Sequence, residues 1–514
     1  MSRIKIPLFI IVHNQYEILK KSVESYEKFI EYPIEIIFHN VASTYWECLN
    51  YLKEKKEQGY KVYESKVNNH HTVVSSVRHY ISEHPECEYI IMTDADVQLH
   101  NVNRNIIDFY IYVLNKLGKT SIGPMLEIHN IPDEYWNKQR AIKGHTQQFW
   151  NKSPKSIQFN GDTYKYIDCN TDTTFQLYSS KRMPRSFPHG NSIRVLSPYS
   201  ALHLDWYVYA NNITPCQLYY LNNTTKISHW NNKTFDRNVH RLFNNFNKNK
   251  HIYYHNSQSI DLKYNFGNYI TEFIYEILFL EKPILDISGG SENKDVIFGS
   301  GSILNKSQTN SIIWGSGFLS EDQIIPKPSK ILSVRGPLTR ECLLKQGHEC
   351  NDMYGDIALI LPYFYNPDIK KAHKLGIIPR YDEIEKVKDL CKTNDSDIIL
   401  IDTSTSVKNV IDNILKCEMT ISSSLYGLIV SHAYNIKSMW ISIDQNTQNN
   451  FKFRDYYGSV NVTDYHNLLP HIYDNTVSLK HIEEIVNNYP SPIFPINTKK
   501  IIEACPFINI KKSI

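Results

Sequence analysis

Short apolar segments alternate with amphipathic segments along the first part of the chain. The apolar runs 7–13, 33–39 and 89–93 have the length and the continuous hydrophobicity of buried strands. Between them, residues 16–32 and 44–56 repeat apolar side chains at the spacing of a helix that covers one face of a core. Strands that alternate with helices in this way predict an α/β fold with a mostly parallel sheet.

The same alternation begins again after a polar, Asn- and Lys-rich stretch. We interpret residues 231–258 as a linker, although a surface loop inside one domain would have the same composition. The pattern predicts strands at 295–298, 311–314, 330–334, 397–402, 419–422 and 438–442, and helices at 269–280, 337–346, 406–415, 425–434, 480–488 and 499–504. We therefore expect one domain over 1–230 and a second over 259–514.

Composition excludes several classes of protein. The 514 residues carry a formal net charge of only +3, which leaves no basic excess for a dedicated nucleic-acid binder. No apolar run approaches the roughly 20 residues of a transmembrane helix, and the first residues lack a secretory pattern. Nine scattered cysteines with no Cys-x-x-Cys pair predict neither a disulfide framework nor a zinc site. We expect a cytoplasmic protein without a transmembrane segment.

Two carboxylates follow the strand at 89–93. Asp94 and Asp96 are separated by one residue at the carboxyl end of this strand, so a bend would let both point the same way. Such a pair is suited to a hard divalent cation, Mn²⁺ or Mg²⁺, that bridges a nucleotide diphosphate. The cation would neutralise the leaving diphosphate.

Ordered motifs around this pair give the region 5–230 a specific resemblance. It resembles the nucleotide-sugar glycosyltransferases of the GT-A fold. The motifs are His13-Asn14, His39-Asn40, Asp94-Ala95-Asp96, Ile122-Gly123-Pro124-Met125-Leu126-Glu127-Ile128, Asp172-Thr173-Thr174-Phe175-Gln176-Leu177-Tyr178, Ile193-Arg194-Val195, Leu202-His203-Leu204-Asp205-Trp206-Tyr207 and Ser228-His229-Trp230.

The resemblance implies roles for five residues. Asp94 and Asp96 would hold the metal and the diphosphate of a nucleotide-sugar donor. Either His229 or His203 would complete the metal site, unless it is a hydrogen-bonded structural histidine. Asp172 would activate the acceptor hydroxyl as a base whose pKa burial raises, or else it would cap the turn that follows it.

The second half places glycines directly after its predicted strands. Backbone N–H groups at such glycines can approach an anion closely, which makes Gly301 and Gly317 candidate contacts to a ligand. Neither the phosphate loop of nucleoside triphosphatases nor the dinucleotide fingerprint occurs.

The region 260–470 resembles the polysaccharide pyruvyl transferase family. The matching motifs are Asn265-Phe266-Gly267, Gly301-Ser302-Ile303-Leu304, Ile313-Trp314-Gly315-Ser316-Gly317, Val334-Arg335-Gly336-Pro337-Leu338-Thr339-Arg340, Tyr354-Gly355-Asp356, Gly376-Ile377-Ile378-Pro379-Arg380-Tyr381, Ser422-Ser423-Ser424-Leu425-Tyr426-Gly427 and Phe451-Lys452-Phe453-Arg454-Asp455. The resemblance implies a GT-B-like pair of Rossmann-type subdomains that transfers pyruvate from phosphoenolpyruvate to a glycan acceptor, with no covalently bound cofactor.

Binding the phosphate and the carboxylate of phosphoenolpyruvate requires positively charged side chains. Arg335 could bind it bidentately, with Arg454 as a second candidate. Ser423 and Ser424 lie at the start of a predicted helix, where backbone N–H groups bind anions and where serines also act as helix caps.

Three positions depart from the family's pattern. Tyr426 stands where the family has a catalytic histidine, Asn268 replaces an aspartate, and Arg380 replaces another histidine. A tyrosine with a pKa near 10 is a poor proton acceptor at neutral pH. His432 lies six residues beyond Tyr426 on the same predicted helix and therefore faces elsewhere.

Two hypotheses follow for the function. The first is a bifunctional enzyme of polysaccharide synthesis that transfers both a sugar and a pyruvyl group. The second is an active glycosyltransferase whose C-terminal half has lost catalysis and binds glycan or acts as a scaffold.

Overall fold

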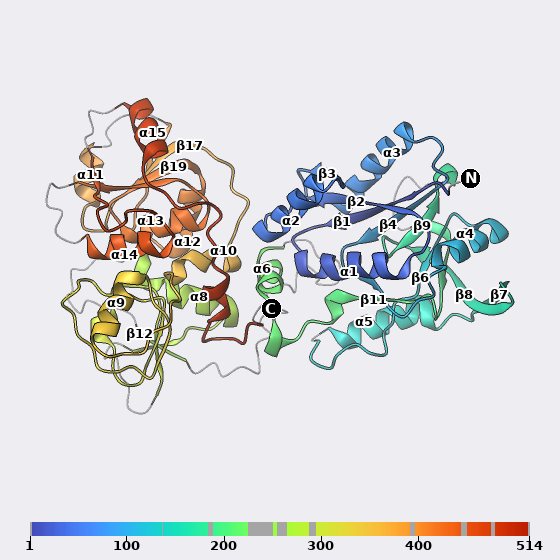
Figure 1. Cartoon of the computed structure of the whole chain (residues 1–514), viewed down its shortest axis with the longest axis horizontal. Coiled ribbons are helices and arrows are strands. Elements are labelled where there is room, and N and C mark those ends of the chain that lie inside the picture. The colour runs from blue at the N-terminus through green and yellow to red at the C-terminus, as the bar shows by residue number, and fades with distance from the viewer. Residues whose placement is uncertain are drawn as a thin grey trace. The chain divides into compact units, whose positions relative to one another are not determined.

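A computed structural model of the chain describes residues 3–135, 137–182, 189–224, 250–253, 265–286, 294–390, 396–443, 450–473 and 478–511. These residues form two compact units (Figure 1). The first contains residues 3–210 and Thr224, and the second contains 211–223 and the described residues from 250 to 511. Residues 211–223, which we expected in the first domain, therefore belong to the second unit. His229 lies outside the described residues.

The first unit is built on a nine-stranded sheet with the order β3-β2-β1-β4-β9-β6-β10-β8-β7. Strands β3, β2, β1 and β4 are parallel, whereas β9 runs antiparallel between β4 and β6. The strands are β1 Ile6–Val12, β2 Ile34–Val41, β3 Lys61–Ser65, β4 Tyr89–Asp94, β6 Ser121–Pro124, β7 Lys155–Phe159, β8 Asp162–Thr171, β9 Gln176–Ser179 and β10 His189–Val195. A separate pair joins β5 Val97–Leu99 to β11 Ala201–His203.

Helices cover both faces of the parallel part of this sheet. All seven residues of β1 are buried, as expected for a strand with helices on both sides. Phe9 and Ile11 pack against the apolar face of α3, which contributes Val77 and Tyr80. Figure 1 shows α1 on the opposite side of the sheet. The helices are α1 Tyr16–Phe29, α2 Trp46–Glu57, α3 Val73–Glu83, α4 Ile106–Leu117 and α5 Lys138–His145.

The second unit contains two five-stranded sheets. The first has the order β13-β12-β14-β15-β16 and the second the order β18-β17-β19-β20-β21, and every pairing in both is parallel. The strands are β12 His251–Tyr253, β13 Ile284–Asp286, β14 Val296–Phe298, β15 Ser311–Trp314, β16 Lys330–Ser333, β17 His373–Ile378, β18 Ile398–Leu400, β19 Cys417–Ser422, β20 Ser438–Ser442 and β21 His471–Ile472. This confirms the α/β class and the pair of Rossmann-type subdomains. Strand β12 lies inside the segment 231–258 that we expected to be a linker.

Most helices of the second unit connect its parallel strands. The helices are α6 Pro215–Asn223, α8 Ile270–Phe279, α9 Pro337–Lys345, α10 Leu361–Phe364, α11 Ile384–Leu390, α12 Val407–Leu415, α13 Leu425–Ala433, α14 Phe451–Ser459, α15 Leu479–Asn488 and α16 Lys499–Glu503. Helix α6 precedes the parallel strands in sequence, whereas α15 and α16 follow them. Ser406 caps α12 by accepting a hydrogen bond from the Asn409 amide, and Pro337 opens α9 at a position where no amide hydrogen is needed. Within the described ranges, every helix is too short or too polar to span a bilayer.

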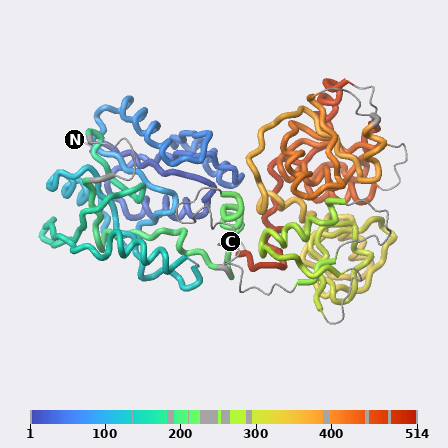
Figure 2. Tube along the Cα trace, turned by 180° about the vertical axis from the view of Figure 1, so that it is seen from behind, coloured from blue at the N-terminus to red at the C-terminus, as the bar shows by residue number. Residues whose placement is uncertain are grey.

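Two segments from the end of the chain return to the first sheet of this unit. Helix α14, which follows β20 of the second sheet, packs against α9. The C-terminal segment also contacts the first subdomain. The Trp314 indole donates a hydrogen bond to the Ile501 carbonyl, and Phe507 packs on Trp314 and Tyr275. Figure 2 shows this red segment beside the green helix α6. The chain therefore crosses between the two subdomains more than once.

Candidate active sites

The predicted carboxylate pair lies at the centre of the first unit's sheet. Strand β4 ends at Asp94, and Asp96 lies in the turn that leads directly into the short strand β5. The Thr173 hydroxyl donates to one Asp94 carboxylate oxygen at 2.6 Å, and the Thr173 carbonyl accepts from the Asp94 amide at 2.8 Å. Asp94 is thereby held beside the segment that follows β8.

Strand β11 brings His203 to the same place. It pairs antiparallel with β5, with His203 opposite Val97, and the Asp96 carbonyl accepts from the Leu204 amide at 2.7 Å. The His203 Nδ1 atom is 3.4 Å from an Asp96 carboxylate oxygen. Asp205 follows on the next turn. We call Asp94, Asp96, His203 and Asp205 the acidic cluster.

Burial sets the electrostatics of the acidic cluster. It raises the pKa of Asp94, and the neighbouring Asp96 charge raises it further. Burial and the Asp96 charge likewise raise the pKa of Asp205, whose carboxylate accepts a 2.6 Å hydrogen bond from Gln15. Burial lowers the pKa of His203 to about 3, so its imidazole is neutral. The carboxyl groups of Asp94, Asp96 and Asp205 therefore lie close enough to disfavour one another's ionisation, and the His203 imidazole beside them carries no charge to offset this.

This donor set suits a divalent cation. Carboxylate oxygens and a neutral imidazole are ligands that Mn²⁺ accepts, and a cation would offset the burial and the repulsion that raise the pKa values of Asp94 and Asp205. Among the described residues, however, no group of three or more His, Cys, Asp or Glu side chains is arranged to hold a metal ion. The few protein ligands at this place would not fill the coordination shell of a divalent cation. Positions would remain open for the oxygens of a diphosphate.

Asp172 lies near the acidic cluster, but its environment differs from our expectation. Its side chain is 60% exposed and forms a 2.8 Å ion pair with Arg194, which is itself buried. Desolvation raises the pKa of Asp172, but the Arg194 charge and a hydrogen bond from the Thr174 hydroxyl outweigh it, so the pKa is lowered. Asp172 also accepts from the Thr174 amide at 3.2 Å, which is the turn-capping contact that was the alternative to a base.

Asn40 is the last but one residue of β2, at a position where the GT-A resemblance implies an acidic nucleotide contact. Its side-chain amide donates to a Glu64 carboxylate oxygen at 2.7 Å. Glu64 lies on β3, directly opposite Asn40 in the parallel register. A carboxylate is therefore present at this edge of the sheet, although it belongs to the neighbouring strand.

A second pocket lies within the second unit, between its two parallel sheets. Its volume is about 350 Å³, and side chains from both subdomains line it. We call it the cationic pocket. The lining residues are Asn265, Asn268, Gly301, Ser302, Ile303, Asn305, Lys306, Leu319, Arg380, Tyr381, Ser424, Leu425, Tyr426 and Lys452.

Helix α13 begins at this pocket. Ser424 caps it by accepting from the Gly427 amide at 3.4 Å, and the neighbouring Ser423 hydroxyl donates to Glu383. The Tyr426 hydroxyl accepts a 3.1 Å hydrogen bond from Ser300, and burial raises the pKa of Tyr426. The Tyr426 ring lies directly over Gly267, where an added Cβ would be 1.9 Å from the ring. Gly267 is therefore required by the close approach of this ring.

Arg335 lies behind the wall of the cationic pocket. Its side chain is fully buried and forms a 2.9 Å ion pair with Asp455, which is equally buried. The remaining guanidinium nitrogens donate to the Ser302 hydroxyl and the Phe318 carbonyl, both at 2.5 Å. Gly317 leaves room for this guanidinium, because a Cβ there would be 2.5 Å from it. The predicted contacts Arg335 and Gly317 thus belong to one internal network.

The cations that line the pocket are different residues. Lys452, at the start of α14, lies in the pocket, and burial followed by the charges of Arg380 and Arg335 lowers its pKa to about 8. Arg380 also lines the pocket while its guanidinium contacts Asp382 at 2.8 and 3.0 Å. The predicted Arg454 is not among the lining residues, since its Nε donates to the Leu468 carbonyl at 3.1 Å.

A sequence model of the polysaccharide pyruvyl transferase family matches residues 165–445, which is more than half of the 514 residues. The chain belongs to this family. The resemblance that we drew from the motifs of the second half is thereby confirmed. The matched segment of this polysaccharide pyruvyl transferase family member begins in β8 of the first unit, well before residue 260, so the match does not mark the boundary between the units.

Three similar proteins show how much of this chain, and of their own chains, the similarity covers. An uncharacterized protein, L143 of Acanthamoeba polyphaga mimivirus, is 29% identical over 163 residues, which are 30% of this chain and 57% of that protein. The mannosyltransferase PcManGT from Pyrobaculum calidifontis, solved with GDP-Man and Mn²⁺, is 11% identical with a TM-score of 0.25 over 39% of this chain and 56% of its own. Residues 1–349 of S. aureus TarS are 10% identical with a TM-score of 0.25 over 47% and 72%. The chain spans under two thirds of the mimivirus relative and of the mannosyltransferase.

The structure locates the three residues that depart from the family's pattern. Tyr426, Asn268 and Arg380 all line the cationic pocket, so the replaced residues gather at one place in this family member. His432 is fully buried, contacts the Tyr456 hydroxyl at 2.8 Å and has a pKa lowered to about 4 by burial. As expected, it does not replace the family's histidine.

Some of the residues that we did not assign could have been found from their place in the sequence. Arg194 and Asp205 are charged residues inside otherwise apolar motifs, a pattern typical of a buried ion pair or a ligand. Lys452 stands between two phenylalanines at the start of a helix. Gln15 and His145 had no comparable signal, because only the fold brings them to Asp205 and His203.

Proposed function

We propose that the protein is a bifunctional polysaccharide-modifying transferase. The first unit would transfer a sugar from a nucleotide-sugar, and the second would transfer pyruvate from phosphoenolpyruvate to a glycan. The acidic cluster at the end of β4 supports the first activity, and the cationic pocket supports the second.

In the first unit, Asp94 and Asp96 would hold the divalent cation, with His203 behind Asp96. A bound Mn²⁺ or Mg²⁺ would supply neutralisation of the charge that develops on the leaving diphosphate. Asp172 remains ionised because Arg194 lowers its pKa, and it would orient the acceptor hydroxyl and accept its proton late in the transfer. Glu64 and Asn40 would contact the nucleoside.

In the second unit, Arg380, Lys452 and the N-terminus of α13 would bind the phosphate and carboxylate of phosphoenolpyruvate. Transfer as a ketal requires two sugar hydroxyl oxygens to bond to C2 of the donor while the bond from C2 to the phosphate oxygen breaks. One hydroxyl proton balances the proton gained by C3, and the other leaves with the phosphate. Lys452, whose pKa is about 8, is a stronger acid than the buried Tyr426 and is our candidate for the proton donor to C3.

One observation favours a second candidate function for this unit. Tyr426 is buried, hydrogen-bonded to Ser300, and has a raised pKa, so it does not provide the titratable group of the family's histidine. In this alternative the cationic pocket binds an acidic glycan without turnover, and the protein is a glycosyltransferase with a glycan-binding module.

The test uses the full chain. It is incubated with Mn²⁺, a panel of nucleotide-sugars, phosphoenolpyruvate and pyranoside acceptors, while release of nucleoside diphosphate and of inorganic phosphate is followed separately. We expect both products, the first abolished by Asp94→Asn and the second by Lys452→Gln.

Each activity can fail by itself. Phosphoenolpyruvate that binds with no phosphate release would support the glycan-binding alternative. No nucleoside diphosphate from any donor, with phosphate release intact, would overturn the glycosyltransferase assignment alone. Equal rates in a variant and in the unmodified chain would overturn the role of the substituted residue.

A further inference from the structure

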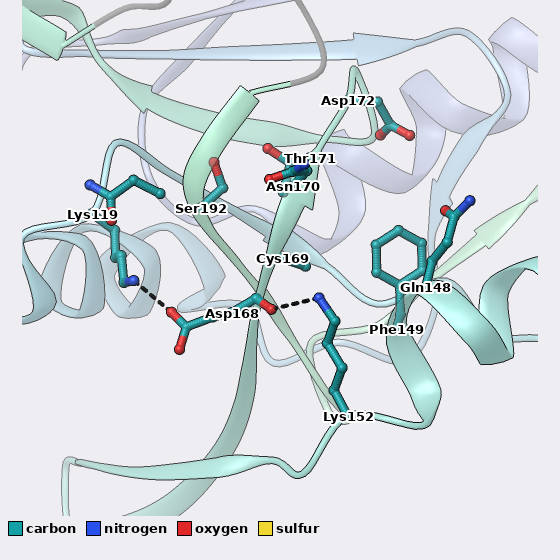
Figure 3. A pocket seen from close by; sticks show the side chains of 11 residues that line it. Lys119, Gln148, Phe149, Lys152, Asp168, Cys169, Asn170, Thr171, Asp172 and Ser192 are labelled. Carbon is teal, nitrogen blue, oxygen red and sulfur yellow. Dashed lines mark hydrogen bonds and ion pairs between the residues drawn. The ribbon is translucent and has the colours of Figure 1, made fainter.

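The first unit contains a pocket that our sequence analysis did not identify. Its volume is about 620 Å³, and Asp172 lies at one end of it (Figure 3). We call it the lysine pocket. Its lining residues come from β8 and the residue after it, from β10, from the helical turn 146–150, and from the loops before β6 and β7: Lys119, Gln148, Phe149, Lys152, Asp168, Cys169, Asn170, Thr171, Asp172, Asn191 and Ser192.

Three lysines surround one carboxylate of this pocket. The ammonium groups of Lys119 and Lys155 contact the two oxygens of Asp168 at 2.5 and 2.6 Å, and Lys152 donates to the Asp168 carbonyl at 3.0 Å. Figure 3 shows Lys119 and Lys152 approaching Asp168 from its two sides. Hydrogen bonds from Lys119 and then Lys155 lower the pKa of Asp168, so it stays ionised.

The charges do not cancel. Asp168 can neutralise one of the three lysines, and Asp172 is already paired with Arg194 at 2.8 Å. In the part of the chain that the structure describes, no carboxylate forms an ion pair with Lys152, whose contact is a neutral carbonyl. The pocket therefore keeps a positive charge beside the polar side chains that line it.

The remaining lining groups suit a sugar. Gln148, Asn170 and Asn191 carry amides, which both donate and accept hydrogen bonds as sugar hydroxyls require. The hydroxyls of Thr171 and Ser192 are buried and hydrogen-bonded to Ser121, so the amides are the groups offered to a sugar. A concave surface with a few convergent polar groups is typical of a small-molecule subsite.

We infer that the lysine pocket binds the acceptor glycan of the first unit, and that this acceptor carries an anionic group held by Lys152 and Lys119. The inference rests on the proposed glycosyl transfer, because Asp172 at the end of the pocket is our candidate base. The anionic group is a carboxylate or a phosphate. A carboxylate could be the pyruvyl ketal that the second unit would form, in which case pyruvylation precedes sugar transfer.

The experiment measures binding, so it does not depend on turnover. The full chain is titrated calorimetrically with methyl 4,6-O-(1-carboxyethylidene)-glucoside, with its neutral 4,6-O-ethylidene analogue, and with methyl glucoside 6-phosphate. Asp94→Asn/Lys452→Gln serves as the background, so that neither proposed reaction consumes a probe. Lys152→Gln is compared with Lys165→Gln, which removes an exposed lysine of strand β8 that does not line the pocket.

We expect one acidic probe to bind about fivefold more tightly than the neutral analogue, which corresponds to the upper range for an accessible ion pair. Lys152→Gln should remove this preference, and Lys165→Gln should keep it. The probe that is preferred identifies the carboxylate or the phosphate as the source. Equal affinities for charged and neutral probes, no binding of any probe, or a preference that survives Lys152→Gln together with Lys119→Gln would each overturn the inference.

The proposed function can be judged separately. If the unmodified chain releases nucleoside diphosphate equally well with neutral and acidic acceptors, the glycosyltransferase stands and the acidic acceptor is wrong. If the acidic probe binds through Lys152 while no nucleotide-sugar is consumed, the binding site stands and the glycosyl transfer is wrong.

Discussion

The acidic cluster and the cationic pocket have opposite chemistry and opposite construction. The acidic cluster gathers carboxyl groups whose pKa values are raised by burial, and we propose that it binds a cation. The cationic pocket gathers ammonium and guanidinium groups, one with a lowered pKa, and it suits an anion. Burial disfavours negative charge in the acidic cluster and positive charge in the cationic pocket. At each site the proposed ligand carries the opposite charge and would compensate for this cost.

The two sites also differ in how the chain builds them. Two members of the acidic cluster, Asp94 and Asp96, are separated by a single residue after one strand. Arg380, Tyr426 and Lys452 follow three different strands of the second unit. A site made by one strand end can be recognised in sequence, whereas a site made by several depends on how the strands are placed.

The largest expected effect separates the two sites most clearly. Asp94→Asn keeps the size of the side chain and can still accept from Thr173, but it removes the charge that would hold the cation. We expect nucleoside diphosphate release to fall on the order of 10³-fold, because metal stabilisation of the leaving group is lost. Phosphoenolpyruvate binding should be unchanged. Asp108→Asn, at a surface ion pair with Arg3, is the control. Full transfer in both Asp94→Asn and Asp96→Asn would exclude the metal assignment.

The next effect concerns stability in the second unit. Arg335→Met leaves the fully buried Asp455 without its ion-pair partner, which should lower the free energy of unfolding by about 3–5 kcal/mol. Arg380→Met breaks a half-exposed pair with Asp382 and should cost about 1 kcal/mol or less. Urea denaturation measures both. If Arg335→Met unfolds like the unmodified chain but no longer binds phosphoenolpyruvate, Arg335 is a donor ligand after all.

The pH dependence of the second unit should follow Lys452. Its pKa is lowered from 10.5 to about 8, so steps that need the ammonium should weaken above that pH, by about tenfold at one unit higher. The native state releases this proton before the unfolded chain does, so the contribution of Lys452 to stability rises from about pH 8 towards 10.5 and cannot cause the loss. Phosphate release by the unmodified chain and phosphoenolpyruvate binding by Lys452→Arg are each recorded against pH. Lys452→Arg should extend binding to higher pH; a binding profile equal to that of the unmodified chain would assign the titration to another group.

The smallest expected effect is that of Tyr426→Phe. Ser300 loses its 3.1 Å contact with the Tyr426 hydroxyl but keeps a 3.0 Å hydrogen bond to the Gly267 carbonyl. The free energy of unfolding should therefore fall by about 1 kcal/mol at most. Phosphate release should change only a few fold if Lys452 is the proton donor. A loss of more than a hundredfold, with the fold intact by circular dichroism, would instead make Tyr426 the acid.

Much of the fold followed from local pattern, and the exceptions have physical reasons. The apolar strands β1, β15 and β20 lie within one residue of their predicted bounds, because strands buried on both faces have continuous apolar sequences. Strand β8 was not predicted: one of its faces is exposed, and Tyr164 and Tyr166 alternate with polar residues. Strand β12 was hidden in a polar stretch because only three residues form it.

For the sites, residue types were more predictable than roles. The sequence led us to expect charged groups near Asp94 and Tyr426, and it led us to expect that Arg335 faces a ligand. Its guanidinium is instead saturated by Asp455, Ser302 and Phe318. An arginine after a strand has the same local sequence in both situations, and only the position of Asp455 on α14, more than a hundred residues away, distinguishes them.

The crossing of the chain inside the second unit has a consequence for how that unit loses its structure. Helix α14 and the C-terminal segment follow the second sheet in sequence but pack on the first, through α9 and Trp314. Neither sheet can therefore lose its order while the other keeps a complete set of neighbours. The unit should melt as a single cooperative block, and removing the last residues from Ile501 onward should weaken the sheet that lies furthest from them along the chain.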